Sequence, residues 1–248
     1  MNLLLVSIIT PNYNSEKFIA ETISSVLKQT YEHWEMIIVD DASTDNSIKI
    51  INAYLEKDSR IQLHQLSKNV GAGVARNKAI ELSKGSFIAF LDSDDLWLPK
   101  KLEEQISFMN RNKYNFTHTS YEEINENGVK TNKIINCKKK INYAQMLYCN
   151  KIGCLTAVYN KDVLGKVYMP NIRKRQDYAL WLQLLKKEEF VYGIPKNLAS
   201  YRVRSNSISN NKIEMLQWNW RLYTEVENLS YFRGIYYVLA NIINKILK

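Results

Sequence analysis

Short apolar runs alternate with helical patterns through the first hundred residues, and this alternation narrows the possible folds more than any other feature of the chain. Each run has the length of a buried strand, and the segment after it carries apolar residues three or four positions apart, as an amphipathic helix does. Alternating strands and helices favour a mostly parallel sheet with helices on both faces. The predicted strands are residues 3–10, 34–39, 61–66 and 87–91.

The loops that follow these strands should lie together. Right-handed crossovers place every strand-to-helix loop of a parallel sheet at the same edge. In open sheets of this kind, ligands bind at that edge, beyond the carboxyl ends of the strands. We therefore expect a binding site formed by residues 10–14, 40–45, 69–76 and 92–95.

The last of these loops is the most acidic. The apolar run 87–91 leads directly into Asp92, Asp94 and Asp95. Carboxylates beside a buried strand are costly unless a cation neutralises them. A divalent cation held against a substrate phosphate would do so. The alternative is a solvated turn that caps the helix beginning near Lys100, and this stretch alone does not decide between the two.

The second half of the chain is less regular. Tyr178, Trp181, Leu182 and Leu185 repeat at helical spacing and predict a helix over residues 173–185. Asp177 stands at the start of that helix, where it could act as a plain N-cap. The other expected elements are a helix at 102–109, strands at 116–121, 155–159, 190–193 and 198–204, a polar hairpin or loop at 122–140, and a long helical region from about 212.

Composition limits the partners and the compartment. The 248 residues carry 34 Lys and Arg against 25 Asp and Glu, a net charge of +9, which favours anionic partners such as nucleotide sugars, nucleic acid or acidic lipid head groups. Nucleic acid is disfavoured, because the basic residues are scattered and no aromatic stripe accompanies them. Three cysteines without CxxC spacing suggest neither a disulfide framework nor a zinc site.

The hydrophobic stretches suggest a protein of the cytoplasm. No run approaches the roughly 18 apolar residues of a membrane span. The N-terminal apolar stretch lacks a basic leader and a cleavage site, so we interpret it as a strand and not as a signal peptide. A peripheral position on the inner face of the cell membrane stays open.

Six blocks in this order identify a resemblance: SIITPNYN, VDDASTD, NVGAGVARN, FLDSDD, QDYALWLQLL and YRVRSNS. Together they resemble an inverting family 2 glycosyltransferase of the GT-A fold, from Val6 to about Ser209. The resemblance implies transfer of a hexosyl or N-acetylhexosaminyl group from a UDP-sugar to a saccharide or lipid-linked acceptor in bacterial surface polysaccharide synthesis. It divides the chain into a nucleotide-sugar-binding half (1–97), an acceptor-binding and catalytic half (98–209) and a C-terminal helical extension (210–248).

The resemblance also implies roles for residues on the donor side. Asp41 would accept a hydrogen bond from the uracil ring N–H, which suits an ionised carboxylate because it only accepts. Its alternative role is to cap the next helix, and Asp40 competes for either role. Asp92 and Ser93 would lie on the ribose side. Thr10, Pro11 and Tyr13 would border the base and ribose, and Arg76, Arg202 and Arg204 are the diphosphate candidates.

For the chemistry, the resemblance implies that Asp94 binds Mn²⁺ or Mg²⁺, with Asp92 as a second candidate ligand, and that Asp177 is the general base. Asp95 would support the metal site or cap a helix. Trp181 would lie beside Asp177 on the acceptor side, where partial burial could raise the pKa of that base. Arg204 stands where many members carry a histidine, which leaves the metal's third protein ligand in question.

The C-terminal residues 233–248 predict an amphipathic helix. Its expected apolar face comprises Ile235, Val238, Leu239, Ile242, Ile243 and Ile246, and Asn241 and Lys245 lie opposite. Such a helix could lie on an anionic membrane surface, pack on the domain, or contact a second subunit. Alternative functions are a nucleotidyltransferase or other nucleotide-sugar enzyme, and a non-catalytic module that binds a nucleotide-sugar or nucleic acid.

Overall fold

The computed structural model describes residues 4–204 and 212–246. The strands are β1 (Val6–Asn12), β2 (Trp34–Asp40), β3 (Ile61–Gln65), β4 (Phe87–Phe90), β5 (Leu96–Trp97), β6 (Phe116–Ile124), β7 (Lys130–Ile135), β8 (Lys140–Ile141), β9 (Val158–Asn160) and β10 (Val191–Arg202). The helices are α1 (Ile19–Leu27), α2 (Ser47–Leu55), α3 (Ala72–Leu82), α4 (Lys101–Asn112), α5 (Tyr143–Tyr148), α6 (Lys161–Leu164), α7 (Gln176–Leu185), α8 (Lys212–Arg221) and α9 (Tyr231–Ile246), with a 3₁₀ turn η1 (Cys154–Thr156) and a π-helical turn η2 (Leu222–Val226).

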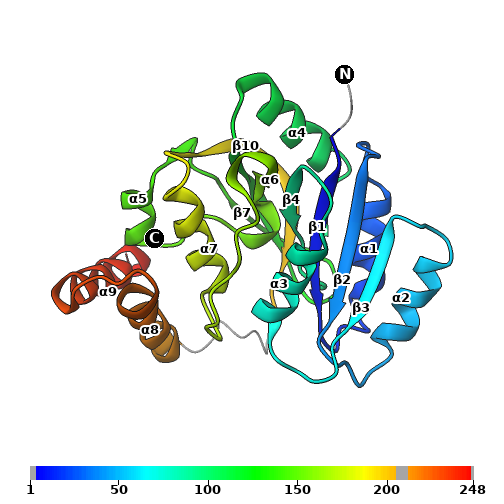
Figure 1. Ribbon diagram of the computed structural model, residues 1–248, viewed down its shortest axis with the longest axis horizontal. Helices are drawn as coiled ribbons and strands as arrows, with labels where there is room; N and C mark the ends of the chain where they lie inside the picture. Colours follow the sequence, from blue (N-terminus) through cyan, green and yellow to red (C-terminus); the bar gives the residue numbers. More distant parts are fainter. Residues whose placement is uncertain (1–3, 205–211, 247–248) are drawn as a thin grey trace.

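The strands form one mixed sheet in the order β3-β2-β1-β4-β9-β6-β10-β5, with β7 beside β6 and β8 beside β10 (Figure 1). The first four strands run parallel, as the strand–helix alternation predicts. Their side chains alternate between two buried faces. Ile8 and Ile38 lie in the core under α1, α2 and α4, whereas Ile9 and Ile37 lie in the core under α3 and α7.

The second half extends the same sheet. Strand β9 runs antiparallel to both β4 and β6, and thereby joins the two halves, while β6 and β10 run parallel. The polar segment 122–140 forms the predicted hairpin, through the end of β6 and β7. Two expectations differ: residues 154–156 form the turn η1 before the short β9, and the two strands expected after residue 190 are one bulged strand, β10.

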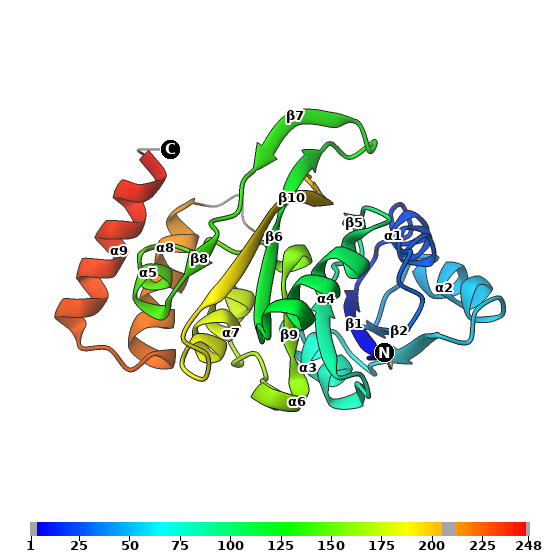
Figure 2. The same ribbon diagram turned by 90° about the horizontal axis from the view of Figure 1, so that it is seen from above.

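Helices α8 and α9 pack against each other, α9 also packs against α5, and α9 lies at the outer edge of the molecule (Figure 2). The predicted face of α9 is only partly right. Ile235 and Leu239 are about half exposed, but Asn241, expected on the outer side, is buried and donates to the hydroxyl of Tyr223 at 2.6 Å. In the part of the chain that the structure describes, none of the helices combines the length and apolarity that crossing a membrane requires.

Candidate functional site

The loops at the carboxyl ends of β1, β2 and β4 meet at one rim, as the parallel topology requires. Asn12 at the end of β1 donates to the carboxylate of Asp40 at 2.7 Å. The next residue, Asp41, is buried and accepts hydrogen bonds from the backbone N–H groups of Val70 and Gly71 at 2.8 and 2.7 Å. Asp41 therefore does not cap α2. It fixes the loop that leads into α3.

The three residues expected to border the base differ in their exposure to solvent. Thr10 and Pro11 are buried within β1, and the hydroxyl oxygen of Thr10 has no hydrogen-bond partner among the described residues. Tyr13, just beyond the strand, is 49% exposed. Ser93 is buried and its hydroxyl lies 2.7 Å from that of Ser15, which ties the acidic loop to the loop after β1. Tyr13 is thus the accessible member of this group.

The acidic loop is paired with arginines from two other elements. Arg76 in α3 donates to the Oδ1 atom of Asp92 at 2.6 Å. Burial disfavours the charge of Arg76, but Asp92 and, more weakly, Asp177 favour it, and together they raise the pKa of its guanidinium. Arg204, just after β10, donates to the Oδ2 atom of Asp94 at 3.0 Å and stays about one third exposed. The predicted rim residues are therefore brought together.

Burial raises the pKa of both neighbouring carboxylates, Asp94 and Asp95. Burial and the nearby charge of Asp92 raise the pKa of Asp94, and Arg204 partly offsets this rise. Asp95 is 1% exposed, and burial with the charges of Asp94 and Asp92 raises its pKa well above the ordinary value. Asp95 accepts a hydrogen bond from the backbone N–H of Arg202 at 2.8 Å. It supports the loop from inside and caps no helix.

Arg202 is one of the predicted diphosphate ligands, but its guanidinium is bonded within the protein. Its side chain is fully buried. The guanidinium donates to the carboxylate of Glu21 at 2.6 Å, to the carbonyl of Asp94 at 2.8 Å and to the carbonyl of Glu126 at 2.9 Å. Arg202 thus joins α1, the acidic loop and the β6–β7 turn, and it presents no donor to a ligand.

Asp177 lies in the first turn of α7 and is partly exposed at the rim. It is not the N-cap, because that position is held by Arg175 in a left-handed conformation with φ of 66°. Asn150 donates to the Oδ2 atom of Asp177 at 3.2 Å. The aspartate therefore has an amide partner and lies near Arg76, whose pKa it raises.

Trp181, predicted to lie on the acceptor side, does not reach the surface. The indole is fully buried, with its ring centre 5.3 Å from that of Phe90 and 5.7 Å from that of Phe116. Trp181 follows Asp177 by one turn on the same face of α7, but this turn of the helix is enclosed by the core. Tyr178 is buried as well, and its hydroxyl contacts that of Tyr223.

Comparison with known proteins identifies the family. A family model described as "Glycosyl transferase family 2" matches residues 7–167. The chain belongs to glycosyltransferase family 2. It is 45% identical over 230 residues to the Bacillus subtilis glycosyltransferase TuaG, which is named for teichuronic acid biosynthesis, covering 93% of this chain and 91% of TuaG.

A second relative is the Escherichia coli protein named UDP-Glc:alpha-D-GlcNAc-diphosphoundecaprenol beta-1,3-glucosyltransferase WfgD, 42% identical over 98% of this chain and 94% of WfgD. Among solved structures, Staphylococcus aureus TarS in complex with UDP-GlcNAc matches with a TM-score of 0.76 at 21% identity, over 96% of this chain and 72% of that one. The expected GT-A fold is confirmed by this likeness.

Asp92 and Asp94 have the ligand type that a divalent cation shared with substrate phosphates requires. No group of three or more His, Cys, Asp or Glu side chains suited to a metal ion occurs within residues 4–204 and 212–246. Mg²⁺ in nucleotide sites usually takes only one or two carboxylates, completing its shell with waters and substrate phosphates. Asp92 and Asp94 each have one oxygen in an ion pair, which leaves the other for such a cation.

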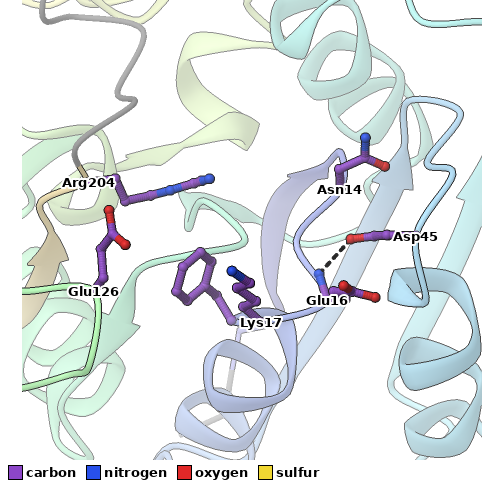
Figure 3. Close-up of a pocket in the computed structure, with 7 residues that line it drawn as sticks. Asn14, Glu16, Lys17, Asp45, Glu126 and Arg204 are labelled. Carbon is purple, nitrogen blue, oxygen red and sulfur yellow. Dashed lines mark hydrogen bonds between the residues drawn. The ribbon is translucent and has the colours of Figure 1, made fainter.

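Arg204, the partner of Asp94, lines a hollow of about 360 Å³ (Figure 3). Arg204 and Glu126 lie on one side of it, and Asn14 and Asp45 on the other. The guanidinium of Arg204 lies 5.0 Å from the ring centre of Phe18. Asn14, Asp45 and Arg204 lie in predicted parts of the site, but sequence reasoning missed Phe18 and Glu126, because the lining residues come from four segments that carry no shared pattern.

Sequence reasoning also missed Asn150 and Gln176. The side-chain oxygen of Gln176 accepts from Arg76 at 3.4 Å, so the residue before Asp177 links α7 to the Arg76–Asp92 pair. A signal for Gln176 existed, since it opens the block QDYALWLQLL. Asn150 lies in an irregular loop after α5 and had none.

Proposed function

We propose that this chain moves a sugar from a UDP-sugar to a hydroxyl group of a lipid-linked saccharide during synthesis of a cell-surface polysaccharide. The proposal rests on the convergence at one rim of two aspartate–arginine pairs and a third carboxylate, Asp177. The name of WfgD supports a lipid-linked saccharide as the acceptor, and the name of TuaG supports a role in polysaccharide synthesis. Family membership favours sugar transfer over a nucleotidyltransferase or a binding module.

On the donor side, the exposed ring of Tyr13 would pack against the uracil base. Asp41 would accept the uracil N–H while it continues to hold the loop at Val70 and Gly71, because each carboxylate oxygen has two lone pairs. Arg76 and Arg204 offer guanidinium groups beside the acidic loop. Guanidinium matches phosphate oxygens in charge and geometry, so these two residues would bind the diphosphate.

Asp94, assisted by Asp92, would hold Mn²⁺ or Mg²⁺. A divalent cation bound there supplies Lewis-acid stabilisation of the charge that develops on the departing diphosphate. Arg204 would help to stabilise the charge on the departing diphosphate, because it lies beside Asp94 and remains partly exposed. We expect activity to depend on the metal, with Arg204 contributing part of the neutralisation.

Asp177 would act as the general base. Asn150 occupies its Oδ2 atom, so Oδ1 is the atom that would accept the proton from the acceptor hydroxyl. As that proton leaves, the acceptor oxygen bonds to the anomeric carbon, and the bond to the diphosphate breaks on the opposite face with its electron pair. A single displacement of this kind inverts the anomeric configuration.

We also propose that the protein works in the cytoplasm against the inner face of the cell membrane. The outer side of α9 exposes Phe232, Ile235, Tyr236, Leu239 and Ile243, which we call the α9 stripe. Residues 231–248 contain no acidic side chain and carry Arg233, Lys245 and Lys248. An apolar stripe with flanking cations suits an anionic bilayer surface. A second copy of the chain is the competing partner for this face.

A panel of UDP-sugars, each tested for UDP release and for transfer to a lipid-diphosphate saccharide, tests the proposed reaction. Asp177→Asn should retain UDP affinity and lose transfer by about a hundredfold or more. Asp94→Ala should abolish the increase in UDP affinity that Mn²⁺ gives in calorimetric titration. Asp162→Asn, an exposed acid on α6, is the matched control. A fully active Asp177→Asn protein, or a wild-type protein that binds no UDP, would overturn the proposal.

A further inference from the structure

A second hollow, of about 460 Å³, lies between α3, residues 170–176 and α8. Its volume is in the range of small-molecule sites. Val70, Val74 and Trp218 give it apolar walls, and Asn171, Arg173 and Arg221 supply polar groups. We call it the α3–α8 groove. It shares no lining residue with the hollow that Arg204 lines.

One wall of the groove belongs to the same helical turn as the proposed base. Gln176, the residue before Asp177, lines it. Gln176 packs directly on Gly73 of α3: a Cβ atom at Gly73 would lie only 2.6 Å from the side-chain carbon Cδ of Gln176. Because Gln176 also accepts from Arg76, it separates the groove from the Arg76–Asp92 pair. A molecule in the groove would therefore lie across Gln176 from the Arg76–Asp92 pair, beside the first turn of α7.

The groove combines cations with an aromatic ring. Arg173 is exposed, and its guanidinium forms no ion pair with any described residue. Arg221 lies 4.7 Å from the ring centre of Trp218 and is held by Glu225 at 3.0 Å. The neighbouring pair of Lys174 and Glu214, at 2.6 Å, ties the groove loop to α8. An anchored tryptophan and two arginines thus line the same groove, and the charge of Arg173 also contributes to the lowered pKa of Glu214.

We infer that the α3–α8 groove binds the sugar-diphosphate end of the lipid-linked acceptor, an inference that rests on the proposed function. Trp218 would pack against the C–H face of the acceptor sugar, and Arg173 would pair with the diphosphate. Helix α8, which forms one wall, packs beside α9 (Figures 1 and 2). A lipid chain leaving the groove over α8 would meet the same side of the molecule that carries the α9 stripe.

Calorimetric titration with decyl-diphospho-α-GlcNAc, in the presence of saturating UDP and Mn²⁺, tests this inference. UDP fills the donor site, so the titration reports on a separate site. We expect Arg173→Gln to weaken binding about tenfold, and Trp218→Phe to weaken it less. Arg111→Gln, an exposed arginine on α4, is the matched control. Methyl α-GlcNAc, which lacks the diphosphate, should bind weakly and equally to wild type and Arg173→Gln.

The outcomes separate the inference from the proposed function. Wild-type protein that binds UDP but not the decyl diphosphate overturns the groove assignment alone. The groove assignment is also overturned if Arg173→Gln and wild type bind the decyl diphosphate with equal affinity. It is overturned as well if Arg173→Gln lowers the affinity for methyl α-GlcNAc as much as it lowers the affinity for the decyl diphosphate. Failure of the wild type to bind UDP or to release it from any UDP-sugar would overturn the proposed function itself. Unchanged UDP affinity in both groove variants is the result expected if only the acceptor is affected.

Discussion

Replacement of Arg202 by methionine should destabilise the fold without acting directly on the donor. The substitution keeps most of the side-chain length and removes the guanidinium. It deletes the hydrogen bonds to the carboxylate of Glu21 and to the carbonyls of Asp94 and Glu126. These bonds connect α1, the acidic loop and the β6–β7 turn, so their loss would loosen three elements together.

The structure sets the size of the effect. Hydrogen bonds that involve a charged group contribute roughly 1.5–3 kcal/mol each, and they are not additive. Glu21 is 55% exposed, so water can solvate its carboxylate once Arg202 is gone. Removing one partner of a buried ion pair costs about 3–5 kcal/mol. Because only the arginine is buried, we expect a loss of about 3 kcal/mol, at the low end of that range.

Urea unfolding measures this change as a shift in midpoint at constant slope. Arg204→Met is the matched control, because Arg204 is partly exposed and makes one ion pair, and it should cost less than about 1 kcal/mol. The reasoning is refuted if Arg202→Met lies within about 0.5 kcal/mol of wild type. A loss of UDP affinity at unchanged stability would return Arg202 to the diphosphate role.

Two further predictions concern other parts of the chain. Burial lowers the pKa of His118 to about 4, so the unfolded chain binds a proton that the folded chain rejects. The free energy of unfolding should therefore fall by about 3 kcal/mol as the pH drops from about 6.5 to 4. In urea titrations His118→Gln should remove this pH dependence, and a pH profile of His118→Gln equal to that of the wild type would contradict the prediction. Ile235→Asp with Leu239→Asp should abolish flotation with phosphatidylglycerol vesicles, whereas Ile134→Asp, equally exposed on β7, should not. Flotation that survives the double substitution would exclude the α9 stripe as the membrane contact.

The sequence predicts the first four strands well because their signal is local. Each strand is buried on both faces and appears as an apolar run, and the parallel connections then fix which loops share a rim. The pairing of Arg76 with Asp92 is compatible with that shared rim, whereas the pairing of Arg204 with Asp94 depends on where β10 ends. The order of the strands after β4 depends on contacts between distant segments, which no local pattern encodes.

The errors at the site concern the direction of side chains. Arg202 and Arg204 are two residues apart, yet one is enclosed and the other partly exposed, because β10 ends at Arg202. Trp181 follows Asp177 by one helical turn, and that single turn takes it from the rim into the core. The polarity of Asn241 predicts that it faces outward, but the buried hydroxyl of Tyr223 accepts a hydrogen bond from it. Such partners come from other elements, so periodicity cannot reveal them.

The contact of Asn241 with Tyr223 bears on how the protein unfolds. Tyr223 donates to the carbonyl of Leu147 at 2.7 Å and lies 3.1 Å from the hydroxyl of Tyr178 in α7. Helices α5, α7 and α9 thus share one buried chain of polar groups, and opening any of them leaves the others with unpaired donors. The C-terminal helices should therefore exchange amide hydrogens together with α7, as a single cooperative unit and not as a detachable tail.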